Sequence, residues 1–541
     1  MAERTTVEIT DDTLAGAARP LVDRLVSDGV ASALTAQNAT LWGEEAEPEA
    51  SIRLAWTTLH KSSRALIGEI EALRTDLRSE GIDRIVLAGM GGSSLAPEVI
   101  TSTEGVALTV LDTTDPGQVS DALAGDLDRT LLVVSSKSGT TVETDSHRRI
   151  FAEAFAEAGI DAARRIVAVT DPGSPLAQLA ASEGYRKVFL ADPHVGGRYS
   201  ALTAFGLVPS GLAGADVARL LDQAAGIAEA LSADSPDNPA LTLAAALAAA
   251  HTDGAEKVVL TDTGSGIAGF GDWAEQLIAE STGKEGTGLL PVVVEGPAAP
   301  GFADAGSDAT TVAVGPRVQG AALAVEGPLG AQFLLWEYAV AVAGRLLGIN
   351  PFDQPDVEAA KKAARALLDN PQALTGTEEP SAVIGPVEVY AAPGDQAVPA
   401  TGTLADVLRQ FVGGVADGGY LAVQAYLDRL DDASASLLRS ELARCSGRQT
   451  TFGWGPRFLH STGQYHKGGH RNGSFLQITG SAEQDVPVPG RPYTLSTLQL
   501  AQALGDGQVL AEGGRPVLRL HLTDRAAGLA DVVRAVQELT R

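Results

Sequence analysis

The sequence predicts an α/β fold in which parallel sheets are covered by helices on both faces. Two observations carry this prediction. From residue 84 onward, short apolar runs bounded by turn residues alternate with stretches of helical periodicity. The same alternation restarts near residue 257. Such alternation is typical of βαβ units. A chain of 541 residues is too long for one ordinary core, so we expect two or three packed units.

The elements are expected in this order. Helical spacing predicts helices over 11–28 and 48–80, and Pro48 suits a first helical turn. The first βαβ series predicts strands over 85–88, 107–111, 130–134, 165–169 and 187–190. The second series predicts strands from 257 and over 290–294, and helices over 272–282 (closed by Gly283 at C′), 331–347 and 355–368. The last third predicts strands at 420–424, 449–452 and 517–522, and a helix over 434–444.

These elements divide the chain into five parts. Residues 1–80 form an N-terminal helical segment, 81–213 a first α/β unit, and 214–370 a second. Residues 371–403 are rich in Pro, Gly and Thr and are expected to be a linker. Residues 404–541 form a C-terminal α/β region. We expect this region to complete the second unit, and a small third unit is the alternative.

Composition excludes several classes of function. The net charge is -28, which disfavours non-specific binding to nucleic acid or to an anionic membrane. Cys445 is the single cysteine, so neither an intrachain disulfide nor a Cys-based zinc site is possible. The apolar stretch 332–347 is interrupted by Glu337 and Arg345, which indicates a buried amphipathic helix. The N-terminus has no apolar export core, so we expect a cytoplasmic protein.

Two turns rich in small residues lie where an expected strand meets a helix, at 89–94 and 135–141. Amides at a helix N-terminus favour anions, and two such turns could hold one phosphate together. An ordinary strand–helix connection is the alternative for the first turn. The second turn carries four hydroxyls in six residues, together with Lys137, which is more than a connection needs. The Walker A spacing is absent, which disfavours a nucleoside triphosphate.

Two further segments carry charged or polar residues that could contact a ligand. In His194-Val-Gly-Gly-Arg198-Tyr-Ser200, a permanently charged arginine follows two glycines and could approach a ligand closely; a surface arginine in a turn is the alternative. In Asn350-Pro-Phe-Asp-Gln354-Pro-Asp-Val-Glu-Ala-Ala-Lys361, Gln354 and Lys361 are seven residues apart and could share one helix face.

Taken in order, the four segments resemble the phosphoglucose isomerase family, which is built on paired sugar isomerase (SIS) domains. The resemblance covers roughly residues 80–370 and implies two flavodoxin-like, three-layer αβα domains. It implies that Arg198 steadies an enediolate and that Lys361 lies near the ring oxygen of the sugar. The substrate-binding positions that it implies are Gly92, Ser93, Ser136, Lys137, Ser138, Gly139, Thr140, Thr141 and Gln354.

The resemblance also points to a base. Aldose–ketose isomerisation needs a carboxylate that moves a proton between C2 and C1. Glu280 lies at a helix end in a Glu-Ser-x-Gly-Lys motif like that of the short bacterial isomerases. Glu275, five residues earlier, falls on another helix face and is expected to be a surface glutamate.

The ring-opening histidine lies outside the family order. No histidine separates Glu280 from Lys361, whereas a family-like His-Ser-x-Gly-Gln motif occurs downstream at His460. A rearranged chain order explains this, and it resembles the isomerase part of transaldolase–isomerase fusions. We therefore assign ring opening to His460. The nearby His466 and His470 lack an adjacent acidic ligand, so no metal site is expected there.

The resemblance implies interconversion of glucose 6-phosphate and fructose 6-phosphate through a cis-enediolate, as in glycolysis and gluconeogenesis, with no cofactor and no metal. A dual phosphoglucose/phosphomannose isomerase is an alternative. A non-catalytic SIS-type sugar-phosphate sensor is another, which Glu280, Lys361 and the acidic charge disfavour. The expected partners are a sugar phosphate substrate and a second copy of the chain in a homodimer, without nucleic acid or membrane.

Overall fold

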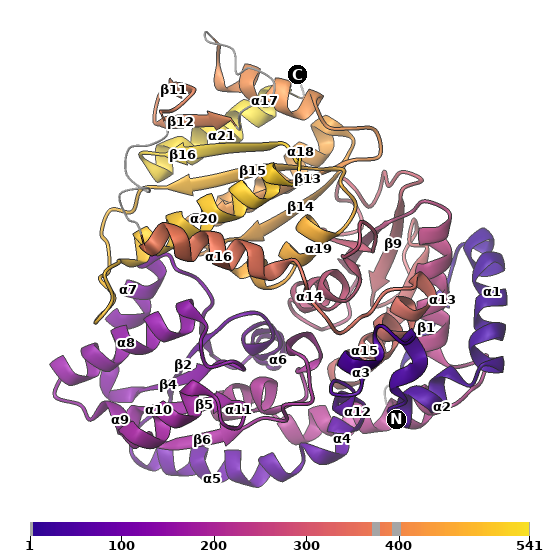
Figure 1. Cartoon of the computed structure of the whole chain (residues 1–541), viewed down its shortest axis with the longest axis horizontal. Helices are drawn as coiled ribbons and strands as arrows, with labels where there is room; N and C mark the ends of the chain where they lie inside the picture. Colours follow the sequence, from indigo (N-terminus) through magenta and orange to yellow (C-terminus); the bar gives the residue numbers. More distant parts are fainter. Residues whose placement is uncertain (1–3, 370–378, 392–401, 540–541) are drawn as a thin grey trace.

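The computed structural model describes residues 4–369, 379–391 and 402–539, and within these ranges it contains three β-sheets. In Figure 1 the first unit lies at the lower left, the second at the lower right and the C-terminal region at the top. Helices α14 (Phe270–Thr282) and α16 (Val357–Asp369) lie in the middle, where the three units approach one another.

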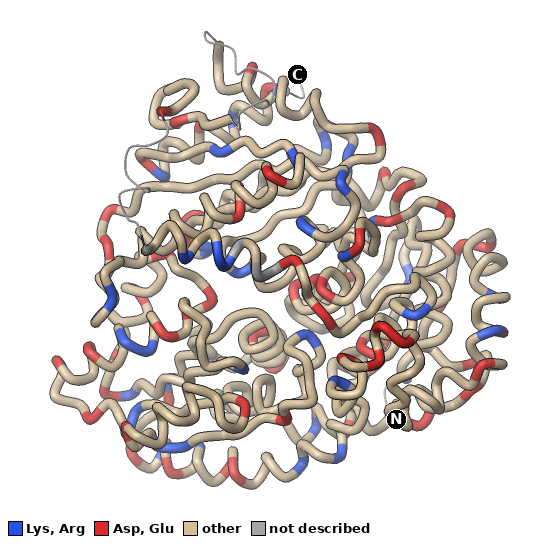
Figure 2. The backbone as a smooth tube through the Cα atoms, in the orientation of Figure 1, with Lys and Arg blue, Asp and Glu red and all other residues tan. Residues whose placement is uncertain are grey.

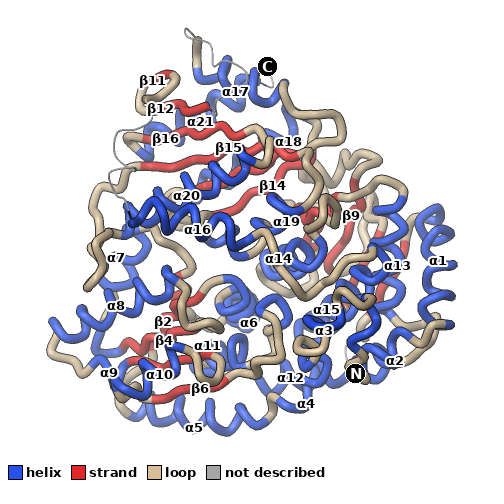
Figure 3. Tube along the Cα trace, viewed as in Figure 1, coloured by secondary structure: helices blue, strands red, loops and turns tan. Residues whose placement is uncertain are grey.

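The first sheet is fully parallel, in the order β3-β2-β4-β5-β6. Each strand alternates its side chains between two helical layers: Ile85 and Leu87 pack with one layer and Val86 with the other. Figure 3 shows α5 and α8 on opposite sides of these strands. The predicted strands are confirmed to within about two residues: β2 (Arg84–Gly89), β3 (Thr109–Leu111), β4 (Thr130–Ser135), β5 (Ile166–Thr170) and β6 (Lys187–Leu190). The helices of the two layers are α5 (Ala65–Ser79), α6 (Leu95–Glu104) and α11 (Ala204–Ala213), and α7 (Pro116–Ala124), α8 (Val142–Glu157), α9 (Ala162–Arg165) and α10 (Pro175–Glu183).

The second sheet has the order β1-β10-β9-β7-β8 and is parallel except for β1. Strand β1 was not predicted, because the N-terminal segment was expected to be mostly helical, with no element before residue 11; the Thr-Val-Glu-Ile sequence of β1 pairs with strand β10. The strands are β1 (Thr6–Ile9), β7 (Lys257–Asp262), β8 (Leu290–Val293), β9 (Ala309–Val314) and β10 (Leu323–Glu326). The helices of this part are α1 (Asp12–Ser27), α2 (Val30–Thr35), α12 (Val217–Ser232), α13 (Pro239–Thr252) and α15 (Leu329–Leu347).

Helix α15 is buried all round rather than amphipathic, which corrects the expectation for 332–347. Every residue from Leu329 to Gly344 is buried. Glu337 is among them, and neither carboxyl oxygen has a hydrogen-bond partner. Burial raises the pKa of Glu337 well above its usual value, so this side chain is accommodated as the neutral acid. Among the described residues, no helix combines the length and apolarity needed to cross a bilayer.

The C-terminal region builds a sheet of its own, in the order β11-β12-β16-β15-β13-β14. Its strands do not pair with those of the second sheet, so the expectation that this region completes the second unit is wrong for the strand pairing. The separate sheet agrees with the alternative of a small third unit. The two sheets nevertheless share a core, in which Leu290 and Val292 pack with Tyr420 and Phe475. Its elements are β13 (Tyr420–Tyr426), β14 (Gln449–Trp454), β15 (Gly473–Gly480), β16 (Val517–Leu522), α17 (Leu404–Gly413), α18 (Leu437–Ser446), α19 (Gly463–Gly468), α20 (Leu495–Glu512) and α21 (Arg525–Leu539).

Two expectations about local structure need correction. The expected linker 371–403 contains a hairpin, β11 (Ala382–Ile384) and β12 (Val387–Ala391), and β12 pairs with β16; its remaining parts, 371–378 and 392–401, lie outside the described residues. The Pro, Gly and Thr content of this segment indicated turns, and the short apolar runs that form β11 and β12 were not recognised as strands. The expected helix 48–80 is broken into α3 (Glu47–Ala50), α4 (Leu59–Ser62) and α5, because the chain turns to bury Trp56 against Tyr199.

Candidate active site

The hydroxyl-rich loop lies between β4 and α8, at the carboxyl edge of the first sheet. Its hydroxyls hold one another: Ser136 Oγ lies 3.0 Å from Thr141 Oγ1, and Ser138 Oγ lies 3.0 Å from Thr140 Oγ1. Thr141 precedes α8 but its side chain does not cap the helix. The N-terminal amides and these hydroxyls together form a cradle suited to an anion.

Lys137 differs from its neighbours in the loop. Its Nζ lies 2.5 Å from Asp171 Oδ2 and donates to the carbonyl oxygen of Pro193 at 3.2 Å. Lys137 does not line either of the two cavities described below that adjoin the loop. The backbone of this residue remains part of the loop, whereas its ammonium group neutralises Asp171.

The first Gly-rich turn, 91–93, joins the loop to two more distant parts of the site. A Cβ atom on Gly92 would lie 2.0 Å from the carbonyl oxygen of Gly197, so only glycine lets this turn pack against the segment that carries Arg198. Gly91 approaches the carbonyl oxygen of His460 in the same way, and Ser93 is buried beside it. The turn therefore fixes the spacing between the arginine and the histidine segments.

Arg198 and Glu280 form a buried ion pair. Arg198 Nε lies 3.1 Å from Glu280 Oε2, and the two side chains are 4% and 7% exposed. The remaining guanidinium donors reach the carbonyl oxygens of Pro351 and Asp353 and the side-chain oxygen of Gln354, each at 3.1 Å. The arginine thus ties the base candidate to the segment that precedes α16.

Glu280 lies in the last turn of α14. Burial raises its pKa above the usual value, and the opposing effect of Arg198 does not cancel that rise. Gly283 ends the helix but with φ of -79°, so the expected left-handed C′ geometry is not used. A Cβ there would lie 2.6 Å from the Cα of Tyr465, which explains the glycine.

Lys284 also anchors the segment that precedes α16. It is fully buried and donates to the carbonyl oxygens of Asn350 and Asp353 at 2.7 and 2.8 Å, and lies 2.6 Å from Asp353 Oδ1. Burial, reinforced by the positive charge of Arg198, lowers the pKa of this ammonium to about 8. The loop from Asn350 to Gln354 is therefore anchored by two cations, Lys284 and Arg198.

His460 comes from the C-terminal region and reaches the site within the same chain. Its Nε2 lies 3.1 Å from Glu143 Oε1, a carboxylate in the first turn of α8. Gln276 Nε2 donates to the His460 carbonyl oxygen at 2.9 Å and lies 3.4 Å from Glu280 Oε1. The histidine is thus linked to both carboxylates of the site.

Glu143 is itself held firmly. Gln502 Nε2 donates to Glu143 Oε1 at 2.7 Å, and Thr114 Oγ1 lies 2.9 Å from Gln502 Oε1. Burial raises the pKa of Glu143, but His460 and the backbone amides lower it more, to about 2. This carboxylate is therefore ionised and orients His460.

A cavity of about 390 Å³ lies between the hydroxyl loop and α16. Lys361 of α16 lines it opposite the N-terminus of α8, and Figure 1 shows α16 above the first unit. The polar residues on its wall are Ser138, Thr140, Thr141, Glu143, Lys361, Arg365, His460, Lys467 and Gln502. Anion donors, a histidine and a lysine thus face one space large enough for a sugar phosphate.

Several residues of this site were not assigned from the sequence. Glu143 follows the hydroxyl-rich turn 135–141 by two residues, and a carboxylate in the first turn of a helix beside an anion site was the signal that could have identified it. Gln276, Lys467 and Gln502 carry no such signal, because only the tertiary packing brings Gln276 to the His460 backbone and the other two to the cavity.

The other two histidines of the C-terminal motif have structural partners. His466 is buried, and its Nδ1 lies 3.0 Å from the hydroxyl of Tyr420. His470 Nε2 lies 3.1 Å from Glu256 Oε2. Neither residue lines the cavity that contains His460.

Known proteins resemble the chain in sequence. The family model of phosphoglucose isomerase matches residues 58–309. A protein of Haloquadratum walsbyi named "Probable glucose-6-phosphate isomerase" is 35% identical over 213 residues, which cover 38% of this chain and 49% of that relative, about half its length. A "Glucose-6-phosphate isomerase" of Cyanothece sp. is 31% identical over 368 residues, which cover 56% of this chain and 68% of the relative.

A solved structure resembles it in fold. The crystal structure of a glucose-6-phosphate isomerase from Chlamydia trachomatis aligns with a TM-score of 0.54 at 20% identity, covering 67% of this chain and 87% of that one. The family match includes the loop, Arg198 and Glu280 and stops before Lys361 and His460, which the fold brings to the same site. The chain belongs to the phosphoglucose isomerase family.

Proposed function

We propose that the protein interconverts glucose 6-phosphate and fructose 6-phosphate by moving a proton between C2 and C1. The observation that carries this proposal is the convergence of Arg198, Glu280 and Gln276 with His460, next to a cavity that also contains Lys361. These residues come from segments far apart in the sequence, between residues 198 and 460, and the fold brings their polar groups together.

Substrate binding begins at the phosphate. The hydroxyls of Ser138, Thr140 and Thr141 and the N-terminal amides of α8 donate hydrogen bonds to the phosphate, with Ser136, Gly139 and the Lys137 backbone shaping the loop. Gly92 and Ser93 close the site on one side and Gln354 on another. Holding the phosphate fixes the reacting carbons, which removes most of the entropic cost of alignment.

Ring opening and isomerisation then use separate groups. Ring opening removes a proton from the O1 hydroxyl and adds one to the ring oxygen as the bond between C1 and the ring oxygen breaks, and His460, oriented by Glu143, and Lys361 carry out this transfer. Glu280 takes the proton from C2 and returns it to C1. Arg198 stabilises the negative charge of the cis-enediolate, because it is a buried, preorganised cation.

The proposal is tested with Glu280→Gln, and Glu275→Gln on the same helix is the matched control. Glu275 was expected at the surface, but it is half-buried, and burial and the nearby Asp272 raise its pKa well above the usual value, so glutamine there resembles the neutral acid. In a coupled assay, kcat should fall by about 10³-fold or more for Glu280→Gln and stay near wild type for Glu275→Gln. Incorporation of solvent deuterium at C2, followed by NMR, should stop in Glu280→Gln. Near-normal turnover in Glu280→Gln would place the base elsewhere.

We further infer that the protein acts in the cytoplasm as a homodimer. The acidic composition and the single cysteine support a reducing compartment. Light scattering after size exclusion should give twice the 55.5 kDa of one chain. A mass of one chain at micromolar concentration would contradict the dimer.

A further inference from the structure

A second cavity, of about 510 Å³, lies on the other side of the hydroxyl loop from His460. The two cavities share a wall made by Thr140, Thr141, Val142, Arg365 and Leu368. Neither His460 nor Lys361 lines the second cavity. The ring-opening groups proposed above therefore face away from it.

The charged residues on its wall are four arginines and one aspartate: Arg148, Arg149, Arg365, Arg491 and Asp145. The wall thus carries a formal excess of three positive charges in a chain whose net charge is -28. Figure 2 shows Lys and Arg positions grouped along α16, which lies above the first unit. Such a local excess is costly unless an anion balances it.

One carboxylate serves three of these arginines. Asp145 lies 2.8 Å from Arg148, 2.7 Å from Arg149 and 2.8 Å from Arg491. Although burial raises the pKa of Asp145, the three arginines lower it to about 2, so it stays ionised. Arg148 Nη1 also lies 3.8 Å from Glu183 Oε2, an exposed carboxylate, so two carboxylates face three arginines, and the guanidinium groups retain donors for another anion.

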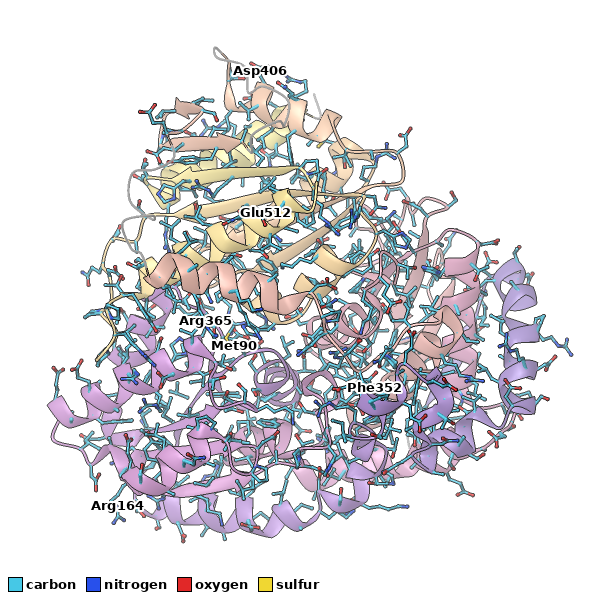
Figure 4. The ribbon with its side chains drawn as sticks, in the orientation of Figure 1. Met90, Arg164, Phe352, Arg365, Asp406 and Glu512 are labelled. Carbon is cyan, nitrogen blue, oxygen red and sulfur yellow. The ribbon has the colours of Figure 1, made fainter. Side chains whose placement is uncertain are left out.

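The fourth arginine has no such partner. Arg365 forms no ion pair with any residue in the described ranges and is exposed on α16. Figure 4 shows it below α16, on the side of the first unit. By contrast, Arg148 is only 6% exposed, and its Nη1 donates to the Tyr185 hydroxyl at 3.2 Å. Arg148 is therefore a buried, fixed part of the cavity wall, whereas Arg365 lies at its solvent-exposed edge.

We propose that this arginine cavity is a second anion site, which binds a compact polyanion such as a molecule with a diphosphate or triphosphate group, separately from the sugar phosphate. Arginine binds phosphate oxygens in a bidentate manner, and several arginines favour a ligand with more than one anionic group. The hydroxyl of Ser136, which lines this cavity and not the first, supplies a further donor on the same wall.

The test measures binding of inorganic pyrophosphate by isothermal titration calorimetry. Pyrophosphate should bind the wild-type protein, and Arg149→Gln/Arg491→Gln should raise its Kd at least tenfold. Arg164→Gln is the control, because Figure 4 places this exposed arginine at the far edge of the first unit; it should leave the Kd unchanged. A Kd that is the same in the double variant, or no binding to the wild type, would overturn the proposal.

A second titration separates this cavity from the substrate site. A saturating equilibrium mixture of glucose 6-phosphate and fructose 6-phosphate should leave the pyrophosphate Kd within threefold. Full displacement of pyrophosphate by the sugar phosphates would show that both use one site. If the double variant does not fold, Arg365→Gln replaces it, since that side chain forms no ion pair with the part of the chain that the structure describes. The readout is binding, so it does not depend on isomerase activity.

Discussion

The C-terminal turn of α14 and the N-terminal turn of α8 each carry a buried carboxylate beside a cationic or ionisable partner, but their acidities move in opposite directions. Glu280, paired with Arg198, has a raised pKa. Glu143, beside His460, has a pKa of about 2.

The partners of the two carboxylates explain much of this difference, because His460 and the backbone amide of Glu143 lower the pKa of Glu143 more than burial raises it, whereas Arg198 does not overcome the burial of Glu280. The position along the helix adds to the effect. The partial positive charge and free amides of a helix N-terminus stabilise Glu143, whereas the C-terminal end of α14 offers Glu280 no such amides. The guanidinium of Arg198 is also shared with three backbone carbonyls and Gln354. An ion pair therefore does not by itself keep a buried carboxylate acidic. The raised pKa of Glu280 suits a residue that takes up and releases a proton, whereas the low pKa of Glu143 keeps that carboxylate ionised.

The largest effect is expected from breaking the ion pair at α14. Arg198→Met should lower kcat by about 10²–10³-fold, because the enediolate loses its preorganised cation. Steady-state assays in both directions measure this loss. Arg164→Met serves as the control, and a Michaelis constant that rises while kcat stays unchanged would limit Arg198 to binding.

A smaller effect is expected from neutralising the carboxylate at α8. Glu143→Gln should lower kcat by about 10²-fold, because His460 loses the charge that orients it. The loss should be greater with the cyclic sugar than with an open-chain analogue. Glu153→Gln, an exposed change on the same helix, should have no effect. Equal losses on both substrates would remove His460 and Glu143 from ring opening.

The pH dependence should distinguish the two regions further. Glu280 acts in its ionised form, so kcat should fall as the pH drops below its raised pKa, which lies above 4.5. Arg198 lowers that pKa, so Arg198→Met should move the acid limb to higher pH. Glu143→Gln should leave the limb in place. A limb that follows Glu143→Gln instead would mean that a different group titrates.

The smallest effect concerns Glu337, a buried carboxyl with neither a cation nor a helix terminus. Its pKa is raised in the folded state, so its ionisation opposes folding as the pH rises above the unfolded value of about 4.3. Glu337→Met should stabilise the protein by about 1–3 kcal/mol at pH 7 and by less at pH 4. Denaturant unfolding at both pH values measures this, and a gain that is independent of pH would indicate improved packing alone.

Much of the fold could be predicted from the sequence where its signals are local. Buried parallel strands such as β6 and β16 read as short apolar runs, and both were predicted with their observed bounds. The edge strand β1 and the hairpin β11–β12 were missed, because short strands gain their stability from a partner strand that is distant in sequence.

The site follows the same division. The hydroxyl loop, Arg198 and Glu280 stand in motifs whose chemistry shows in the order of the residues. The Gln276–His460–Glu143–Gln502 chain of contacts does not, because its members come from four elements and meet only through side-chain packing. Lys137 is a residue that the sequence motif suggested and the structure uses differently, because its ammonium group pairs with Asp171.

The sequence by itself determined the α/β class, the anion loop, and which arginine and glutamate could act on an enediolate, since these depend on residue type and short-range spacing. The tertiary structure alone decided that His460 reaches Glu143 within one chain, that the C-terminal region forms its own sheet, and that four arginines line a second cavity. These outcomes depend on burial and on contacts between distant segments, which set the local charge balance and the pKa of each group.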